Sequence, residues 1–479
     1  MPETRPNIVL ITADQFRGDC LSFLGHPDVK TPYLDTLAAQ GAYFTNMYSA
    51  CPSCIPARAA LMTGMSQTKN GRTGYQDGVS WDYAHTLAGE LAKAGYYTQC
   101  VGKMHVHPPR RMLGFHHIEL HDGYLHYYRR EDTPAPQYQP LMDDYIYWLK
   151  QQLGADRDIT DAGLECNSFL ARPWPYAERY HPTNWVTDRA LDFLRRRDRD
   201  MPFFLNVSYV RPHPPLDAPQ CYFDMYRDAP LAPPVFGDWD DRDAQQRDGR
   251  IIDSMTGSLD PALTRQAQIG YYACITHLDH QIGRLVRELP QNTVVIFTSD
   301  HGEMLMDHCL FRKALPYRGS ALLPLIVWGT HLRGRQERLA ELRDILPTLC
   351  ALAGLPHPAF SDGENLLDGA EGRSFIHGEH AYGEHSNHFI VTGSDKYIWF
   401  SQTGREQYFD LVQDPLETHN AIHDAQHQSR IDALRALLIR ELEGRPEGYV
   451  QDGQLVAGQT PLAVQPSLGA VRPNPRQGD

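Results

Sequence analysis

Polar side chains that can hold a cation follow two apolar runs of the sequence. Asp14 and Gln15 come directly after NIVLIT, and Asp300 and His301 come just after VVIFT. Their oxygen-rich character suits Ca²⁺, and the imidazole widens the choice to Mn²⁺. Taken singly, Asp14 could be a helix N-cap, and Asp300 and His301 could be turn residues. The repetition favours a site for one divalent cation.

Lysines and histidines follow two further apolar runs. Lys103 and His105 come after YTQCV, His213 comes after FFLNVS, and Lys313 lies on the loop beyond VVIFT. Such side chains suit the binding of a tetrahedral oxyanion and proton transfer to a leaving oxygen. A zinc site at His105 and His107 is the alternative, although no thiolate or further histidine stands beside them.

Cys54 stands at the start of a predicted helix. Pro56 suits a first helical turn, and the residues at 57–62 are strong helix formers. The backbone N–H groups and the helix dipole favour an anion at such a position, and Arg58 can reach it from one turn further on. On these local features, a buried thiol before an ordinary helix with a surface Arg58 explains the pattern equally well.

The cysteines do not indicate a disulfide framework. Their number, nine, is odd, and they are scattered along the chain. Reduced thiols are therefore expected. Cys51 and Cys54 form a C-x-x-C pair that could be redox-active or half of a zinc site, but the sequence has no second such pair and the neighbourhood is not thioredoxin-like.

The apolar runs predict buried β-strands, and amphipathic segments between them predict helices. We expect strands at 7–12, 97–101, 203–208, 294–298 and 323–328, and helices at 34–40, 57–63, 86–94, 184–197 and 264–288. This alternation predicts an α/β fold, a mostly parallel sheet sandwiched by helices. Because ligands bind outside the carboxyl ends of parallel strands, the polar groups described above should converge at one edge.

The composition and periodicity of the sequence predict three parts of the chain. The first, 1–375, is the predicted catalytic domain, with excursions at about 125–180 and 214–262 that predict lids or binding walls. In the second, 376–450, the hairpin pattern HFIVTGSDKYIWFSQ and a helix at about 426–443 predict a smaller α+β subdomain with an antiparallel sheet. The third, 451–479, is a Pro/Gly-rich tail that could act as an exchanged arm in a homo-oligomer.

The net charge and the distribution of apolar residues indicate which partners and which location to expect. The formal net charge of −14 argues against nucleic acid, whose phosphates need a basic face. No long uninterrupted apolar run predicts a membrane-spanning helix. The N-terminus passes almost directly into an apolar strand, which leaves no room for a signal peptide, so a cytoplasmic location is expected.

Several segments, in order, resemble the sulfatase family. C-I-P-A-R at 54–58 matches its signature C-x-P-x-R. NIVLITADQ and VVIFTSDHGEMLMDH resemble its two metal loops, GYYTQCVGKMH its G-K-x-H segment, and PFFLNVSYVRPHPP the strand with its substrate histidine. KYIWFSQTGREQYFDLVQDPLETHN resembles its C-terminal segment. The resemblance spans about 5 to 420, and together the blocks are far more specific than the five-residue signature.

The resemblance implies an alkaline-phosphatase-like fold and a set of residue roles. Cys54 matches the cysteine that a dedicated maturation enzyme oxidises to formylglycine, and Arg58 matches the residue that holds it. The remaining matches are metal ligands at Asp14, Gln15, Asp300, His301 and the modified Cys54, and sulfate-binding and proton-transfer residues at Lys103, His105, His213 and Lys313. Gln15 stands where many relatives have Asp, and His301 where others have Asn. These departures lower the negative charge around the ion and leave Ca²⁺ or Mn²⁺ open.

The implied reaction is hydrolysis of a small sulfate monoester. An aldehyde hydrate carries two hydroxyls, one to attack sulfur and one to expel sulfate afterwards. Phosphonate monoester or phosphodiester hydrolases are the nearest alternative, since they share the D-Q and D-H pairs but tend to lack G-K-x-H. Choline sulfatases are another resemblance, and an aromatic cage in the insert at 125–180 would suit them. A non-catalytic sugar-binding relative is the alternative of another class. Aryl, sugar and choline esters all remain open.

Overall fold

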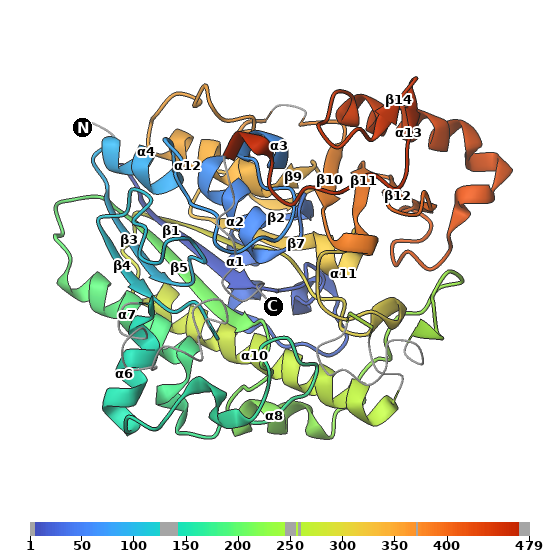
Figure 1. Cartoon of the computed structure of the whole chain (residues 1–479). Helices are drawn as coiled ribbons and strands as arrows, with labels where there is room; N and C mark the ends of the chain where they lie inside the picture. Colours follow the sequence, from blue (N-terminus) through green and yellow to red (C-terminus); the bar gives the residue numbers. More distant parts are fainter. Residues whose placement is uncertain (1–4, 125–141, 245–254, 257–259, 370–371, 469–479) are drawn as a thin grey trace.

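The computed structural model describes residues 5–124, 142–244, 255–256, 260–369 and 372–468. A large sheet runs through the centre of the molecule (Figure 1). In spatial order its strands are β4 (His117–Leu120), β3 (Tyr97–Gly102), β5 (Phe203–Pro212), β1 (Asn7–Asp14), β6 (Thr293–Ser299), β7 (Leu322–Trp328), β2 (Ala42–Tyr48) and β8 (Gly334–Gln336), with β9 (Ala340–Glu341) beside β2.

The sheet is mostly parallel, as predicted. Five neighbouring strands, β4, β3, β5, β1 and β6, run parallel to one another, whereas β7 is antiparallel to both β6 and β2. All five predicted strands are present. Strands β2 and β4 were not predicted.

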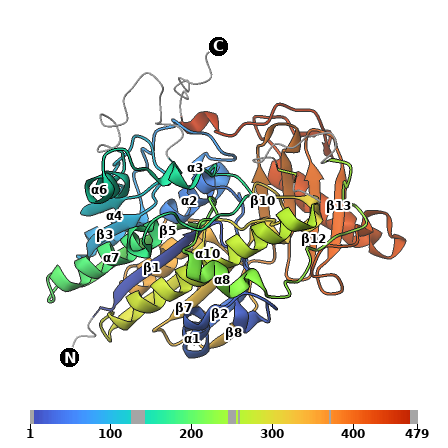
Figure 2. The same ribbon diagram turned by 90° about the horizontal axis from the view of Figure 1, so that it is seen from below.

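Helices cover both faces of this sheet (Figures 1 and 2). Along β1, Val9 and Ile11 pack on one face with α1 (Pro32–Gln40), α6 (Asp144–Leu153), α7 (Pro182–Arg196), α8 (Gln220–Arg227) and α10 (Pro261–Arg287). Ile8 and Leu10 pack on the other face with α2 (Cys54–Thr63), α4 (Leu87–Lys93) and α12 (Ile345–Leu352). Two short helices, α3 (Gln67–Asn70) and α11 (Arg318–Ala321), complete this part. Because alternate residues of one strand enter different cores, the layered arrangement follows from the two-residue period of the strand.

A separate antiparallel sheet forms in the C-terminal region, as predicted. It consists of β10 (Ile376–His380), β11 (Asn387–Val391), β12 (Asp395–Phe400) and β13 (Glu406–Asp410), in that order. Helix α13 (Gln428–Leu442) packs on one face. The other face packs against the main body through Tyr48 and Tyr317. Together, the two sheets give the architecture that the resemblance implies.

The described part of the tail packs on its own chain. A small hairpin, β14 (Val450–Gln451) and β15 (Gln454–Leu455), precedes a stretch that runs beside the loop after α3. There Thr73 N donates to Ala463 O at 3.0 Å, and Gln465 N donates to Gly71 O at 2.8 Å. Residues 469–479, and with them the end of the predicted exchanged arm, lie outside the described residues.

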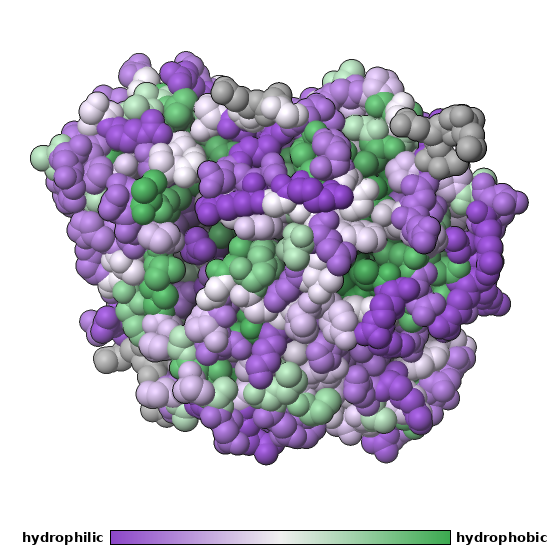
Figure 3. Space-filling model, turned by 180° about the vertical axis from the view of Figure 1, so that it is seen from behind, coloured by the Kyte–Doolittle hydropathy of each residue, from purple (hydrophilic) through white to green (hydrophobic). Residues whose placement is uncertain are grey.

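One face of the molecule carries several separate hydrophobic areas (Figure 3). On the face turned away from the viewer in Figure 1, green areas are separated by hydrophilic residues (Figure 3). Within the described ranges, no helix is both long and apolar enough to cross a membrane.

Candidate active site

The two predicted cation-binding pairs meet at the carboxyl ends of neighbouring strands. Asp14 is the last residue of β1, and β6 pairs with β1 up to Ser299, just before Asp300 and His301. Ligand atoms of Asp14, Asp300, His301 and Cys54 all lie within 4.8 Å of one another, and all four side chains are buried. The convergence predicted from the strand ends is therefore observed.

This group has the chemistry of a divalent cation site. Nδ1 of His301 lies 3.0 Å from the Gly302 carbonyl, which directs Nε2 toward Asp14 Oδ1 at 3.3 Å. A histidine fixed in this way presents its free nitrogen to a metal. Burial and the adjacent Asp14 raise the pKa of Asp300. Two carboxylates held together away from water are stabilised by a bound cation, so these residues fit the cation that the resemblance implies.

Cys54 is the first residue of α2 and faces the same group. Its Sγ lies 3.2 Å from His301 Nε2, 3.7 Å from Asp14 Oδ1 and 3.7 Å from Lys103 Nζ. Burial and Asp14 oppose its ionisation, but Lys103, Lys313 and His301 lower the pKa of Cys54 well below that of an ordinary thiol. An anion is favoured at this position by its surroundings as well as by the helix N-terminus.

Arg58 is buried rather than on the surface, with only 1% of its area exposed. Its Nε donates to Asp300 Oδ2 at 3.0 Å, and its Nη1 donates to Lys103 O and Ser208 Oγ, both at 2.9 Å. Its Nη2 has no hydrogen-bond partner among the described residues and lies 3.7 Å from Asp14 Oδ2. The predicted alternative of a surface position for Arg58 is therefore wrong.

Lys313 and His213 form a pair beside this group. Lys313 Nζ lies 2.6 Å from His213 Nε2 and donates to Gln15 Oε1 at 2.7 Å. His213 Nδ1 lies 2.8 Å from the Pro214 carbonyl. Burial and Lys313 lower the pKa of His213 to about 4. At neutral pH His213 is therefore uncharged, with its Nε2 accepting a hydrogen bond from the ammonium group of Lys313.

Gln15 lies next to the cation group. Its backbone N–H donates to Asp300 Oδ1 at 3.2 Å, and its φ of 67° places it in the left-handed region. Non-glycine residues rarely adopt this conformation, and it is common at functional sites. The side-chain amide contacts Lys313 and Glu303.

Lys103 and His105 lie on the loop that directly follows β3. Lys103 Nζ forms a buried ion pair with Asp14. Asp122 Oδ1 accepts hydrogen bonds from Met104 N at 2.8 Å and His105 N at 3.0 Å, which fixes the loop that carries both side chains. All predicted site residues therefore lie in one region.

Several residues of this region were not found from the sequence. Asp77 Oδ1 lies 3.6 Å from His105 Nε2, and Tyr75 OH lies 3.4 Å from the same atom. His380, at the end of β10, places its Nε2 2.6 Å from Ser53 Oγ, immediately before Cys54. Ser53 is the N-cap of α2 but makes no side-chain cap bond. The C-terminal sheet therefore reaches the segment directly before Cys54.

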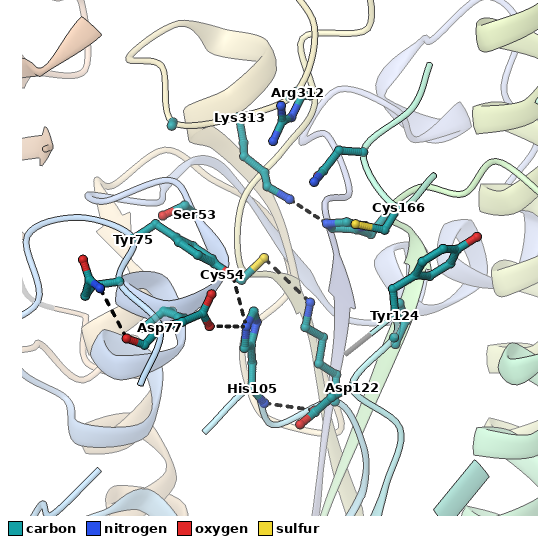
Figure 4. Close-up of a pocket in the computed structure, with 18 of the residues that line it drawn as sticks. Ser53, Cys54, Tyr75, Asp77, His105, Asp122, Tyr124, Cys166, Arg312 and Lys313 are labelled. Carbon is teal, nitrogen blue, oxygen red and sulfur yellow. Dashed lines mark hydrogen bonds and ion pairs between the residues drawn. The ribbon is translucent and has the colours of Figure 1, made fainter. Parts of the chain in front are cut away.

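The site opens into a cavity of about 570 Å³. In Figure 4, Tyr75 and Tyr124 lie on opposite sides of Cys54, while Lys313 points toward it from the loop after β6. Cys166, in the first of the two excursions, also lines the cavity, as does Met255 in the second. Described parts of both excursions therefore form walls of the site, although residues 125–141 and most of 245–259 lie outside the described residues.

The ionisation of His105 is expected to depend on Asp77. Burial and Lys103 lower the pKa of His105, but hydrogen bonding to Asp77 and Cys54 raises it to about 9. If neutral His105 acts as a base, kcat rises as the pH passes its pKa, and Asp77→Asn should move this rise to lower pH. The pH profile of kcat measures the shift. Asp82→Asn, which alters an exposed carboxylate paired with Arg111, is the control, and an unmoved profile in Asp77→Asn would contradict the assignment.

The fold and this site define an alkaline-phosphatase-like hydrolase. The sulfatase family model matches residues 6–355. An arylsulfatase of Clostridium perfringens is 49% identical over 470 residues, covering 95% of this chain and 98% of that protein. A choline-sulfatase of Rhizobium meliloti is 30% identical over 445 residues, covering 88% and 83%. The structure of a phosphonate monoester hydrolase of Agrobacterium radiobacter superposes with a TM-score of 0.73 at 26% identity, covering 91% and 95%.

The chain therefore belongs to the sulfatase family, a family of sulfuric ester hydrolases. The resemblance inferred from separate sequence blocks is confirmed over most of the chain.

Proposed function

We propose that this protein hydrolyses a sulfate monoester to an alcohol and sulfate, with a formylglycine hydrate derived from Cys54 as the nucleophile. The observation that carries this proposal is the position of the Cys54 side chain. It faces the buried carboxylates and His301 on one side and the ammonium group of Lys103 on another. One atom at this position can thus contact both a cation and a bound oxyanion.

We assign one divalent cation to Asp14, Gln15, Asp300, His301 and position 54. The ligands are mainly oxygen atoms with one imidazole, which fits Ca²⁺ best and allows Mn²⁺. When bound, such an ion lowers the pKa of a neighbouring hydroxyl and so supplies a nucleophile at neutral pH. Arg58 holds Asp300 in place through Nε and directs Nη2 toward Asp14.

The cationic residues would bind the sulfate and protonate the leaving group. Lys103, Lys313 and Arg58 can balance the charge that develops on the sulfate oxygens. Of the Lys313–His213 pair, Lys313 is the proton donor that the geometry favours, because His213 is neutral and accepts its hydrogen bond. The S–O bond to the alcohol breaks as the alcohol oxygen takes this proton. His105, in its neutral form, would accept the proton of the second hydroxyl.

The cavity favours a small alcohol, and an aryl group fits its walls best. Tyr75, Tyr124 and Tyr382 line it, and apolar side chains such as Val79 and Val106 supply further surface. Flat aromatic groups pack well between such side chains. The 49% identical relative is named as an arylsulfatase, which agrees with this assignment. Sugar and choline sulfates are the alternatives.

A paired assay tests the activity. With peptide mass spectrometry confirming the state of Cys54, we expect kcat/KM for 4-nitrophenyl sulfate to exceed that for a phenylphosphonate ester. The reason is that this chain has the G-K-x-H pair, as Lys103 and His105, which phosphonate monoester hydrolases tend to lack. A preference for the phosphonate by orders of magnitude would instead make the protein a phosphonate monoester hydrolase, the activity named for the structurally similar Agrobacterium protein.

We also propose a maturation enzyme as a partner of this protein and a division of the chain into three parts. The segment Cys54–Arg58 would be the substrate of a formylglycine-generating maturation enzyme. The boundaries 1–375, 376–450 and 451–479 and the homo-oligomer with an exchanged tail are proposed on the sequence features described above.

A further inference from the structure

Glu303 is a buried carboxylate that joins three segments of the site. Only 1% of its area is exposed. Oε1 accepts hydrogen bonds from the backbone N–H groups of Leu305, at 2.9 Å, and of Arg312, which precedes Lys313. Oε2 accepts a hydrogen bond from Nε2 of Gln15. The carboxylate therefore contacts the first cation loop, its own loop and the loop that carries the proposed proton donor.

The hydrogen bonds around Gln15 leave its amide only one orientation. A carboxylate only accepts, so the NH₂ group of Gln15 must face Glu303. The ammonium group of Lys313 only donates, so the oxygen of the amide must face Lys313, at 2.7 Å. The contacts with Glu303 and with Lys313 therefore identify the same atom of the Gln15 amide as oxygen. This assignment follows from the chemistry of the two partners alone.

We propose that Glu303 is a positioning residue that holds the oxygen of Gln15 toward Lys313 and the cation site. With an aspartate at position 15, a second carboxylate would lie near Glu303, whereas glutamine donates to Glu303 and still offers an oxygen on its other side. This inference rests on the proposed cation site. It assigns Glu303 no contact with substrate or cation.

Glu303→Gln is expected to reverse the Gln15 amide. The backbone N–H groups of Leu305 and Arg312 keep an oxygen at one end of residue 303, so the new NH₂ group must face Gln15. Gln15 would then turn its oxygen to residue 303 and its NH₂ group toward Lys313 and the cation. Changing a residue that orients a metal ligand typically weakens metal affinity about 10- to 100-fold. We expect a loss of this size for Ca²⁺, measured by calorimetric titration of the metal-stripped, full-length protein.

Exchanging the two residues should restore the arrangement. In the double variant Gln15→Glu/Glu303→Gln, the amide at 303 donates to the carboxylate at 15, whose other oxygen faces Lys313. We expect Ca²⁺ affinity to recover most of the loss, a non-additive result that only interacting side chains produce. The single variant Gln15→Glu distinguishes an effect of amide orientation from an effect of added negative charge. If negative charge alone controlled the affinity, this variant would bind Ca²⁺ more tightly than the wild type. We expect no gain in Ca²⁺ affinity, because the carboxylates at positions 15 and 303 would face each other.

Glu341→Gln is the matched control, since Glu341 is also buried, at 2% exposed, and pairs with Arg343 and Arg373 instead. Its Ca²⁺ affinity should equal that of the wild type. Wild-type affinity in Glu303→Gln would overturn the inference, as would a folded double variant without recovered affinity. If the single variant does not fold, a double variant that regains both fold and affinity supports the inference. If the wild type binds neither Ca²⁺ nor Mn²⁺, the proposed cation site fails, and the role of Glu303 fails with it.

Discussion

Replacing Cys54 with alanine is expected to abolish turnover, with kcat for 4-nitrophenyl sulfate falling by about four orders of magnitude or more. The remaining cationic residues would still bind sulfate, so the affinity for sulfate as a product inhibitor should change much less than kcat. Cys51→Ser is the matched control, because Cys51 is a buried thiol three residues earlier in the chain. It should retain activity and a normally oxidised Cys54, as shown by peptide mass spectrometry.

Cys54→Ser tests the need for two hydroxyls at this position. A serine can attack sulfur once, but the resulting sulfate ester lacks the second hydroxyl that would expel sulfate. We expect a single release of alcohol, stoichiometric with enzyme, and a protein heavier by one sulfo group. Sustained turnover by Cys54→Ser near the wild-type rate would contradict a formylglycine nucleophile, and so would full activity of wild-type protein that carries an unmodified thiol.

The sequence was sufficient for the strands that are buried on both faces. NIVLIT, FFLNVS and VVIFT are short, continuous apolar runs, and such runs occur where helices cover both sides of a sheet. Strand β2, AYFTNMY, mixes polar and apolar residues because part of it is only half-buried, so its pattern carried no clear signal. The antiparallel direction of β7 was also beyond prediction, because a run buried on both faces reads the same in either direction.

The site could be predicted where the chain topology itself brings residues together. Asp14 ends β1 and Asp300 directly follows β6, and these two strands are adjacent and parallel. Their proximity therefore follows from the fold. Asp77 and His380 reach the site from a loop and from the second sheet, and their positions depend on packing between segments distant in sequence. Local spacing left Arg58 open to a surface position, whereas the structure buries it against Asp300. The sequence can suggest that Arg58 pairs with a carboxylate, but it does not show that the pair is buried.

Replacing Asp14 with asparagine is expected to cost nearly as much activity as the loss of the nucleophile. Asp14 contacts Lys103, Arg58 and His301, and these groups hold its pKa well below the ordinary value despite burial. It is therefore the permanently ionised ligand of the proposed cation. Stabilisation by such an ion is worth several kcal/mol, so we expect kcat to fall by about a thousandfold.

Metal analysis and stability measurements separate the two effects of this change. Breaking a buried ion pair destabilises a protein by about 3–5 kcal/mol, so Asp14→Asn should also lower the melting temperature. Asp344→Asn removes an equally buried carboxylate that pairs with Arg373. This control should lose stability but keep bound Ca²⁺ and kcat. Chelation of the wild type should reproduce the loss of kcat, and added Ca²⁺ or Mn²⁺ should reverse it. A fully active, chelator-treated enzyme shown to be metal-free would refute the assignment, because the buried carboxylates would then serve catalysis without a cation.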